Sequence, residues 1–271
     1  MNNCSSSSSE LSSRLESLLG LATALPFEAP SSWLTRAALS QGATTGELAD
    51  YFGWRLVPDF DVTFARLRMS PEDDVSALRS LSTARIVLRN LFKTGCSLGR
   101  FLLYSAGRAR YRFCPICLRT TLVPAVPIHW RFAAFRYCPL HHCLLEDDCP
   151  NCGALVTLPE SLITAGTEGE GVGDLSRCLK CEARLYLRPP LRLAHQLFAN
   201  ESGWESAMLQ NGRAVLSALY FGRLEGAGFR GGIRLLRQLD RAGLIPNSSR
   251  VLAAAELRKA PGAFGSMLEP S

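Results

Sequence analysis

Eight cysteine and histidine residues in the middle of the sequence form two sets with the spacing of metal sites. Within each set the ligands come in two pairs, and two residues separate the members of a pair. The first set is Cys114, Cys117, Cys138 and His141, and the second is Cys149, Cys152, Cys178 and Cys181. Two ligands in one tight turn can face a single ion, and a second such turn completes a tetrahedron. The sequence therefore predicts two structural zinc ions, and closed sites of this kind favour recognition or scaffolding over metal catalysis.

Two alternatives concern these residues. His142 follows His141 directly and is the other candidate for the fourth ligand of the first set. The ten cysteines could instead form disulfides, but dense disulfides are typical of small secreted chains, and the serine-rich N-terminus lacks the basic and apolar regions of a secretion signal. No apolar run approaches the roughly 18 to 20 residues that cross a bilayer. We therefore expect a cytoplasmic protein that does not span a membrane. Cys143 is expected to pack as a small apolar residue beside the first site.

The positive charge of the chain is concentrated in one stretch. The formal net charge is +6, and between Asp74 and Glu146 there are eleven lysines and arginines and no acidic residue. Such a local field is a better indication of a polyanionic partner than the overall charge is. For Arg79, Arg85, Arg89 and Lys93, which share one side of a predicted helix, the alternative is a helix face that is simply exposed to solvent. The residues expected to contact nucleic acid or a partner are Thr45, Arg79, Arg85, Arg89, Lys93, Arg108, Arg110 and Arg112.

Helical patterns precede the metal-binding region. Ser31 or Ser32 is expected to cap a helix that carries Trp33 and Leu34, and Thr44 or Thr45 a second helix that reaches Phe52. Two short helices joined by a turn with a glycine have the outline of a helix-turn-helix. A longer helix is predicted from Ser70 and Pro71 to about Lys93, with an apolar side and an arginine side.

Short strands and further helices are predicted after it. Residues 154–158 and 183–187 each follow a pair of cysteines, as the strands of a zinc ribbon do, and the glycine-rich segment 164–174 between them is expected to be a loop. Helices are expected over 191–199, 204–223, 232–242 and 248–259, with a break at 226–231.

The fold class predicted from these patterns is mainly α with small β elements. We expect a weakly helical or flexible N-terminus over 1–26, a helix-turn-helix-like domain over 27–110, tandem zinc-binding modules over 111–188, a C-terminal helical domain over 189–260 and a flexible tail over 261–271.

Motifs of common enzymes are missing or out of context. The chain has no Gly-Lys pair, so it has no phosphate-binding loop of the P-loop type. The G-x-G-x-x-G pattern at 226–231 follows a predicted helix where a dinucleotide site needs a strand, and the G-x-S-x-G pattern at 95–99 falls at a predicted helix end where a hydrolase needs a strand. We therefore expect no enzymatic activity.

Several segments together resemble the TniQ family. They are Phe113–Arg119, His129–Arg131, Tyr137–Leu145, Cys149–Gly153 and Cys178–Cys181, and Glu28–Arg36 resembles the N-terminal Glu-Ser-Leu-x-Ser-Trp-Leu-x-Arg motif of that family. Ala29 and Pro30 depart from the motif, and His142 stands where a glycine is common. The resemblance implies a bacterial targeting subunit of a DNA transposition system, with an N-terminal helix-turn-helix and zinc-binding modules.

The resemblance also implies partners. Members of the family connect target DNA, or a complex that recognises the target, to an AAA+ ATPase regulator that recruits the transposase, and some form dimers. A non-catalytic adaptor is therefore the first hypothesis for this chain. The alternative is a stand-alone, sequence-specific DNA-binding protein with zinc, which would place residues 45–52 near the groove and the arginine stripe on phosphates.

Overall fold

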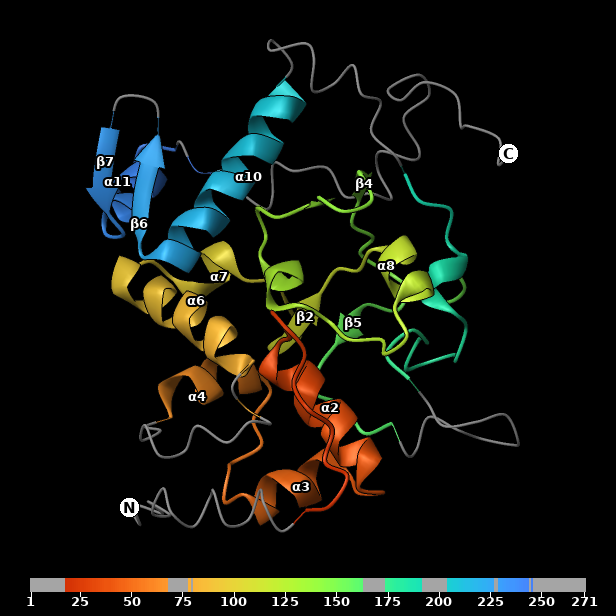
Figure 1. Cartoon of the computed structure of the whole chain (residues 1–271). Coiled ribbons are helices and arrows are strands. Elements are labelled where there is room, and N and C mark those ends of the chain that lie inside the picture. Colours follow the sequence, from red (N-terminus) through yellow and green to blue (C-terminus); the bar gives the residue numbers. More distant parts are fainter. Residues whose placement is uncertain are drawn as a thin grey trace.

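The computed structural model describes residues 18–67, 78, 80–162, 174–191, 204–226, 229–243 and 245. Helices dominate, and the strands are short and lie in small antiparallel sheets (Figure 1). The helical, small-β class predicted from the sequence is therefore confirmed. Within the described residues, no helix is both long and apolar enough to cross a membrane.

Three short helices form the N-terminal part: α2 (Pro30–Ser40), α3 (Thr45–Tyr51) and α4 (Phe60–Arg66). Helix α3 begins with a capping box between Thr44 and Glu47, and Asp59 caps α4 by accepting a hydrogen bond from the Val62 backbone. Ser31 and Ser32 do not cap α2 as expected, because Ala29 is the cap residue and Pro30 the first helical residue. A small aromatic core holds the three helices together; it contains Trp33, Phe52, Trp54, Phe60 and Phe64.

Helix α6 (Leu81–Thr94) continues towards the middle of the molecule. Its buried face carries Ala84, Val87, Leu88 and Leu91, as the helical periodicity predicts. The predicted start at Ser70 and Pro71 lies outside the described residues. Gly95 ends α6 in the left-handed conformation, so the G-x-S-x-G pattern begins at a helix end, as predicted. Its last two residues start the short helix α7 (Leu98–Phe101).

The middle of the chain is made of short elements. Strands β1 (Tyr104–Ser105), β2 (Arg108–Tyr111) and β5 (Val156–Thr157) form one sheet in the order β1-β2-β5, and β3 (Tyr137–Cys138) pairs with β4 (Cys143–Leu144). Helix α8 (Pro115–Thr120) and the 3-10 helices η2 (Ile128–Arg131) and η4 (Leu185–Leu187) complete this part. The strand expected over 183–187 is wrong beyond Arg184, which bridges Arg177, because the following residues form η4.

The C-terminal part contains α10 (Trp204–Phe221), the hairpin of β6 (Arg223–Gly226) and β7 (Phe229–Gly232), and α11 (Leu235–Arg241). The break expected at 226–231 is therefore part of a hairpin whose pairs run from Arg223 with Gly232 to Gly226 with Phe229. Helix α10 matches the expectation closely. The helices expected over 191–199 and 248–259 lie outside the described residues.

One large buried core joins the N-terminal, middle and C-terminal parts. It runs from Ala29 to Ile245 and includes the buried faces of α6 and α10, which lie side by side in Figure 1. The Asn90 side chain of α6 donates to the Leu219 carbonyl of α10 at 2.8 Å. A Cβ atom at Gly212 would lie 2.0 Å from the Ala134 carbonyl oxygen, so only glycine permits this approach of α10. The domain boundaries expected from the sequence remain a prediction; the described parts share this core.

A buried ion-pair network connects the N-terminal helices to the middle of the chain. The Arg131 side chain is fully buried and its guanidinium donates to Asp59 at 2.5 and 2.7 Å and to Asp61 at 2.9 Å. Asp61 also accepts hydrogen bonds from the Ser31 backbone and hydroxyl and from the Tyr111 hydroxyl. Burial opposes ionisation of Asp59, yet the hydrogen bonds and charge of Arg131 lower its pKa below the ordinary value. The Asp59 carboxylate is therefore held as an anion beside the Arg131 cation, and Asp61 contacts the same guanidinium.

We predict that Arg131→Met lowers the free energy of unfolding by about 3 to 5 kcal/mol, because it leaves buried carboxylates without their cation. Arg108→Met is the matched control, since Arg108 pairs with Glu160 through side chains that are 40% and 39% exposed, and its loss should cost at most about 1 kcal/mol. Urea denaturation of both variants at pH 7, in the metal-loaded protein, measures the difference. Equal losses would show that the network does not hold the two parts together.

Candidate metal centres

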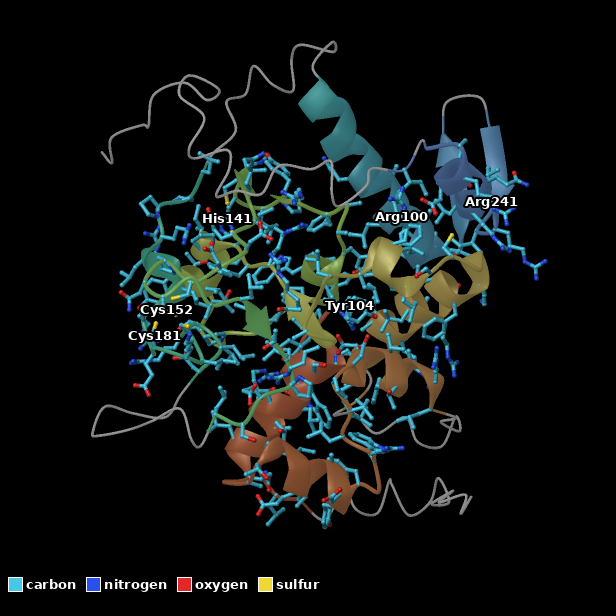
Figure 2. All side chains as sticks on the ribbon, turned by 180° about the vertical axis from the view of Figure 1, so that it is seen from behind. Arg100, Tyr104, His141, Cys152, Cys181 and Arg241 are labelled. Carbon is cyan, nitrogen blue, oxygen red and sulfur yellow. The ribbon has the colours of Figure 1, made fainter. Side chains whose placement is uncertain are left out.

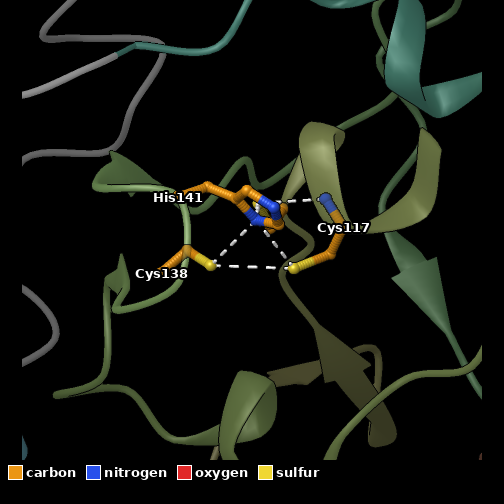
Figure 3. A group of neighbouring side chains, drawn as sticks. Cys117, Cys138 and His141 are labelled. Carbon is orange, nitrogen blue, oxygen red and sulfur yellow. Dashed lines mark hydrogen bonds between the residues drawn. The ribbon is translucent and has the colours of Figure 1, made fainter. Parts of the chain in front are cut away.

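The first group of metal ligands lies between α8 and the β3–β4 hairpin. Cys114 caps α8 and Cys117 lies in its first turn, while Cys138 ends β3 and His141 follows in the turn to β4. The His141 Nδ1 atom lies 3.5, 3.2 and 3.6 Å from the sulfur atoms of Cys114, Cys117 and Cys138, and the last two sulfurs are 3.7 Å apart (Figure 3). Ligands held about 2.3 Å from a tetrahedral ion lie about 3.7 Å from one another. These side chains therefore have the separation that a single ion requires.

The structure distinguishes between the two neighbouring histidines. His141 belongs to the group that could hold an ion. The ring of His142 turns away to Tyr137, whose hydroxyl lies 2.5 Å from His142 Nδ1. His142 also has a φ of 51°, in the left-handed region that glycine adopts without strain. The conformation explains why a glycine suits this position and why His142 is not placed to bind the ion.

The second group consists of Cys149, Cys152, Cys178 and Cys181, whose sulfur atoms all lie within 4.8 Å of one another. Cys149 and Cys181 are 3.6 Å apart, as are Cys152 and Cys178. This group is nearer the surface than the first, since Cys152 is exposed. In Figure 2, Cys152 and Cys181 lie together at one edge of the molecule, away from His141. A hydrogen bond from the Asn151 side chain lowers the pKa of the Cys181 thiol to about 6, which favours the thiolate that binds metal.

Three of the four ligand pairs share one backbone turn. Residues 142, 153 and 182 each follow the second ligand of a pair and donate to the carbonyl of its first ligand, at 2.9, 3.0 and 2.8 Å respectively. All three have a positive φ, and only Gly153 among them is a glycine. The fourth pair, Cys114 and Cys117, instead uses the first turn of α8. This shared turn was missed from the sequence, because His142 and Glu182 do not signal a left-handed conformation.

The donor atoms fit a soft or borderline divalent ion. Each group offers four side chains of sulfur or imidazole nitrogen, the ligand set that zinc takes in closed structural sites. The nine cysteines within the described residues are free thiols, so none is diverted into a disulfide. Cys143 is fully buried and its sulfur lies 3.5 Å from Cys114, as expected of a small residue packed beside the first site.

His129 lies outside both ligand groups. Burial lowers the pKa of His129 to about 4, and its ring packs edge-on against Phe135.

The structure gives internal partners to many residues expected to contact nucleic acid. Arg112 is buried and pairs with Asp147, which Arg110 also binds, and Arg108 pairs with Glu160. Arg112 is therefore not available for a contact at the surface. The acidic partners, Asp147 and Glu160, follow the acid-free stretch in the sequence, and the fold brings them next to its arginines. The local positive field expected from the sequence is accordingly reduced.

The helical residues of that set differ in the same way. Thr45 is buried and lies 3.2 Å from the Ser161 hydroxyl, so it does not face a groove. Arg85 and Arg89 donate to the carbonyls of Leu67 and Ala65 at the end of α4. Lys93 remains exposed, and Arg79 lies outside the described residues. The stripe of cations on α6 is therefore used in part to hold α4.

The N-terminal motif forms a compact hydrogen-bonded group at the start of α2. The buried Glu28 carboxylate pairs with Arg36 at 2.6 Å and accepts from the Ser32 hydroxyl at 2.7 Å. The Trp33 indole donates to the Ala22 carbonyl at 2.8 Å, and the Val126 backbone donates to Ser32. The residues of the motif therefore position α2 against the segment before η2.

Residues 22–145 match the model of one protein family, TniQ. The match includes the N-terminal motif, the Arg131 network and the whole first metal group, and it ends before the second group. A search of curated proteins gave no match.

We predict that His141→Ala reduces the zinc bound per chain by about one ion or weakens it by orders of magnitude, because the first group loses its fourth ligand. His142→Ala, a change of the same size at the next residue, should leave the zinc content unchanged. Elemental analysis of both variants, purified from zinc-containing medium and dialysed, measures this. A larger loss in the His142 variant would reassign the ligand.

Proposed function

We propose that the chain, whose residues 22–145 match the model of the TniQ family, is a non-catalytic targeting adaptor in DNA transposition. It connects target DNA, or a complex that recognises the target, to an AAA+ ATPase regulator, which in turn recruits the transposase. The observation that carries the proposal is the pair of complete four-ligand groups within and beside the family region. Four protein ligands fill a tetrahedral ion and leave no position for a substrate.

The two metals are zinc and act as crosslinks in this proposal. The first joins α8 to the β3–β4 hairpin, and the second joins the turn at Cys149 to the turn at Cys178. Structural zinc contributes on the order of 10 to 16 kcal/mol of coupled binding and folding. The strands around it are short, so each metal adds a fixed crosslink to the buried core that the middle region shares with the rest of the chain.

Rigidity is what an adaptor needs, and charged contacts extend it from the metal groups to the rest of the chain. Arg188, which follows η4, lies 3.3 Å from Asp148 and 3.7 Å from Glu146. Arg131 ties the N-terminal helices to the same region. Surfaces on the N-terminal and C-terminal parts are thus held at a fixed separation, as a protein that bridges two partners requires.

A stand-alone DNA-binding protein is less well supported. Its recognition helix would be α3, whose exposed residues include Glu47 and Asp50. Carboxylates on that face repel phosphates, and Thr45 is buried. The helix-turn-helix outline of α2 and α3 therefore fits a protein contact better than a groove contact.

We predict that Cys114→Ser removes about one zinc ion and unfolds the middle region at 37 °C, because the coupled binding energy of the first group is lost. Cys143→Ser is the matched control: it changes a buried sulfur 3.5 Å away that is not in the ligand group, so the zinc content should stay the same. Thermal unfolding followed by circular dichroism, with elemental analysis, separates the two. Wild-type protein that keeps its transition after exhaustive chelation would overturn the structural role.

The adaptor role predicts a stable complex with an ATPase. When the tagged holoprotein is co-expressed with the products of neighbouring genes, a P-loop ATPase should be retained at near-stoichiometric amounts, and the Cys114→Ser variant should retain much less. Purified holoprotein should not cleave DNA in magnesium or manganese. Recovery of no ATPase, or DNA cleavage that disappears with a ligand variant, would contradict the proposal.

A further inference from the structure

A row of arginines lies on the outer side of the C-terminal hairpin and helix. We call it the α11 arginine surface and define it as Arg230 of β7, Arg234 just before α11, and Arg237 and Arg241 of α11. All four are exposed, and the Arg230 side chain is 70% exposed. Arg241 is labelled at the margin of the molecule in Figure 2, next to the hairpin. The surface lies outside the region that matches the TniQ family.

Helical geometry places three of these arginines on one face. Residues 234, 237 and 241 are three and four positions apart, so they project to the same side of a helix. The helix is anchored in the core through Leu236 and through Ile233 just before it, which are both buried. From Arg234 to Arg241 the row extends about 10 Å at about 1.5 Å per residue. The arginines are thus displayed by a helix that cannot rotate to hide them.

The carboxylates near this surface form ion pairs with other arginines or with Arg230. Glu225 pairs with Arg223 and Arg230 at 3.0 Å, and Asp240 pairs with Arg100 of α7. In the part of the chain that the structure describes, no carboxylate lies within 4.0 Å of the guanidinium groups of Arg234, Arg237 or Arg241. This differs from Arg108, Arg110, Arg112 and Arg131, which all have acidic partners. Three of the four arginines of the α11 arginine surface, Arg234, Arg237 and Arg241, therefore keep a charge that no carboxylate of the described residues pairs with, while Arg230 is paired with Glu225.

Part of the surface has a structural explanation and part has none. The Arg237 guanidinium lies 3.3 Å from where a Cβ atom of Gly95 would be, so it covers the C-terminal end of α6, where a cation is favoured. Exposed Lys93 of α6 lies near the same end and adds to the positive charge. Among the residues that the structure describes, no hydrogen bond or ion pair is found for the side chains of Arg234 and Arg241.

We propose that the α11 arginine surface binds the phosphate backbone of duplex DNA without reading its sequence. One strand carries a phosphate about every 3.4 Å along the axis, so a row of about 10 Å spans about three phosphates. Planar guanidinium groups suit phosphate oxygens. The choice of DNA among polyanions rests on the proposed role in transposition, and the acidic exposed face of α3 leaves the C-terminal part as the cationic side.

The test compares two variants of the full-length holoprotein with the same change in charge. Arg234→Gln with Arg241→Gln removes two cations from the surface and spares Arg237, which covers α6. Arg55→Gln with Arg119→Gln is the control, since both residues are exposed on other elements. Fluorescence anisotropy with a 20-base-pair duplex of arbitrary sequence gives the affinity between 50 and 200 mM salt. The surface variant should bind roughly tenfold more weakly at 50 mM, and its salt slope should fall by about 1.8.

The outcomes separate this inference from the proposed function. Equal binding by the two variants, or no duplex binding by the wild type at 50 mM salt, overturns the inference. Tighter binding to RNA of equal length overturns the assignment to DNA. The same surface variant is also tested for retention of the ATPase. If it retains the ATPase but binds DNA more weakly, the DNA-binding inference is supported and the adaptor role is unaffected. If the wild-type protein does not retain the ATPase, that result counts against the adaptor role alone. Unchanged circular dichroism and melting show that both variants are folded.

Discussion

The buried charge of Arg131 is the constraint on which the arrangement of the chain depends. A guanidinium removed from water is tolerated only when anions and hydrogen bonds replace its solvation, and the same holds for the carboxylate of Asp61. Both side chains are fully buried, and Tyr111 and Ser31 supply the remaining contacts of Asp61. These residues come from η2, α4, β2 and α2, so four elements must meet before any of them is satisfied. The network therefore specifies one relative position of the N-terminal helices and the middle of the chain.

The two candidate metal groups lie among short elements in the middle of the chain. The strands around them contain two to four residues, and three of the four ligand turns are held by their own backbone hydrogen bonds. Those turns place Cys138, Cys149 and Cys178 beside the second residue of each pair. An ion bound there would complete a geometry that the backbone has largely prepared, which would lower the entropy lost on binding.

Folding changes which of the charged residues are available at the surface. The stretch between Asp74 and Glu146 has no acid of its own, yet Asp59, Asp61, Asp147 and Glu160 reach it from either side in the folded chain. Several arginines of that stretch are therefore paired inside the fold, and a group of exposed arginines lies instead at α11, where Asp240 pairs with Arg100. Net charge along the sequence is a poor guide to the surface field, because ion pairs form between segments that the sequence keeps far apart.

The sequence by itself determined the local features. The two-residue gaps define which side chains share a turn, so the eight candidate ligands could be named. Apolar periodicity located α6 and α10, and the Glu28 to Arg36 motif lies in the region that matches the TniQ model. Tertiary structure alone decided the rest. The left-handed turn at His142, which directs its ring away from the first group, depends on a positive φ that a histidine does not signal in the sequence. The hairpin at 226–231 depends on packing against α10 and Leu235. The burial of Thr45 and Arg112 likewise follows from partners more than thirty residues away. Local spacing determines which residues of a segment share a turn or a helix face. The burial and pairing of those residues depend on contacts with distant segments, and these contacts cannot be inferred from a short stretch of sequence.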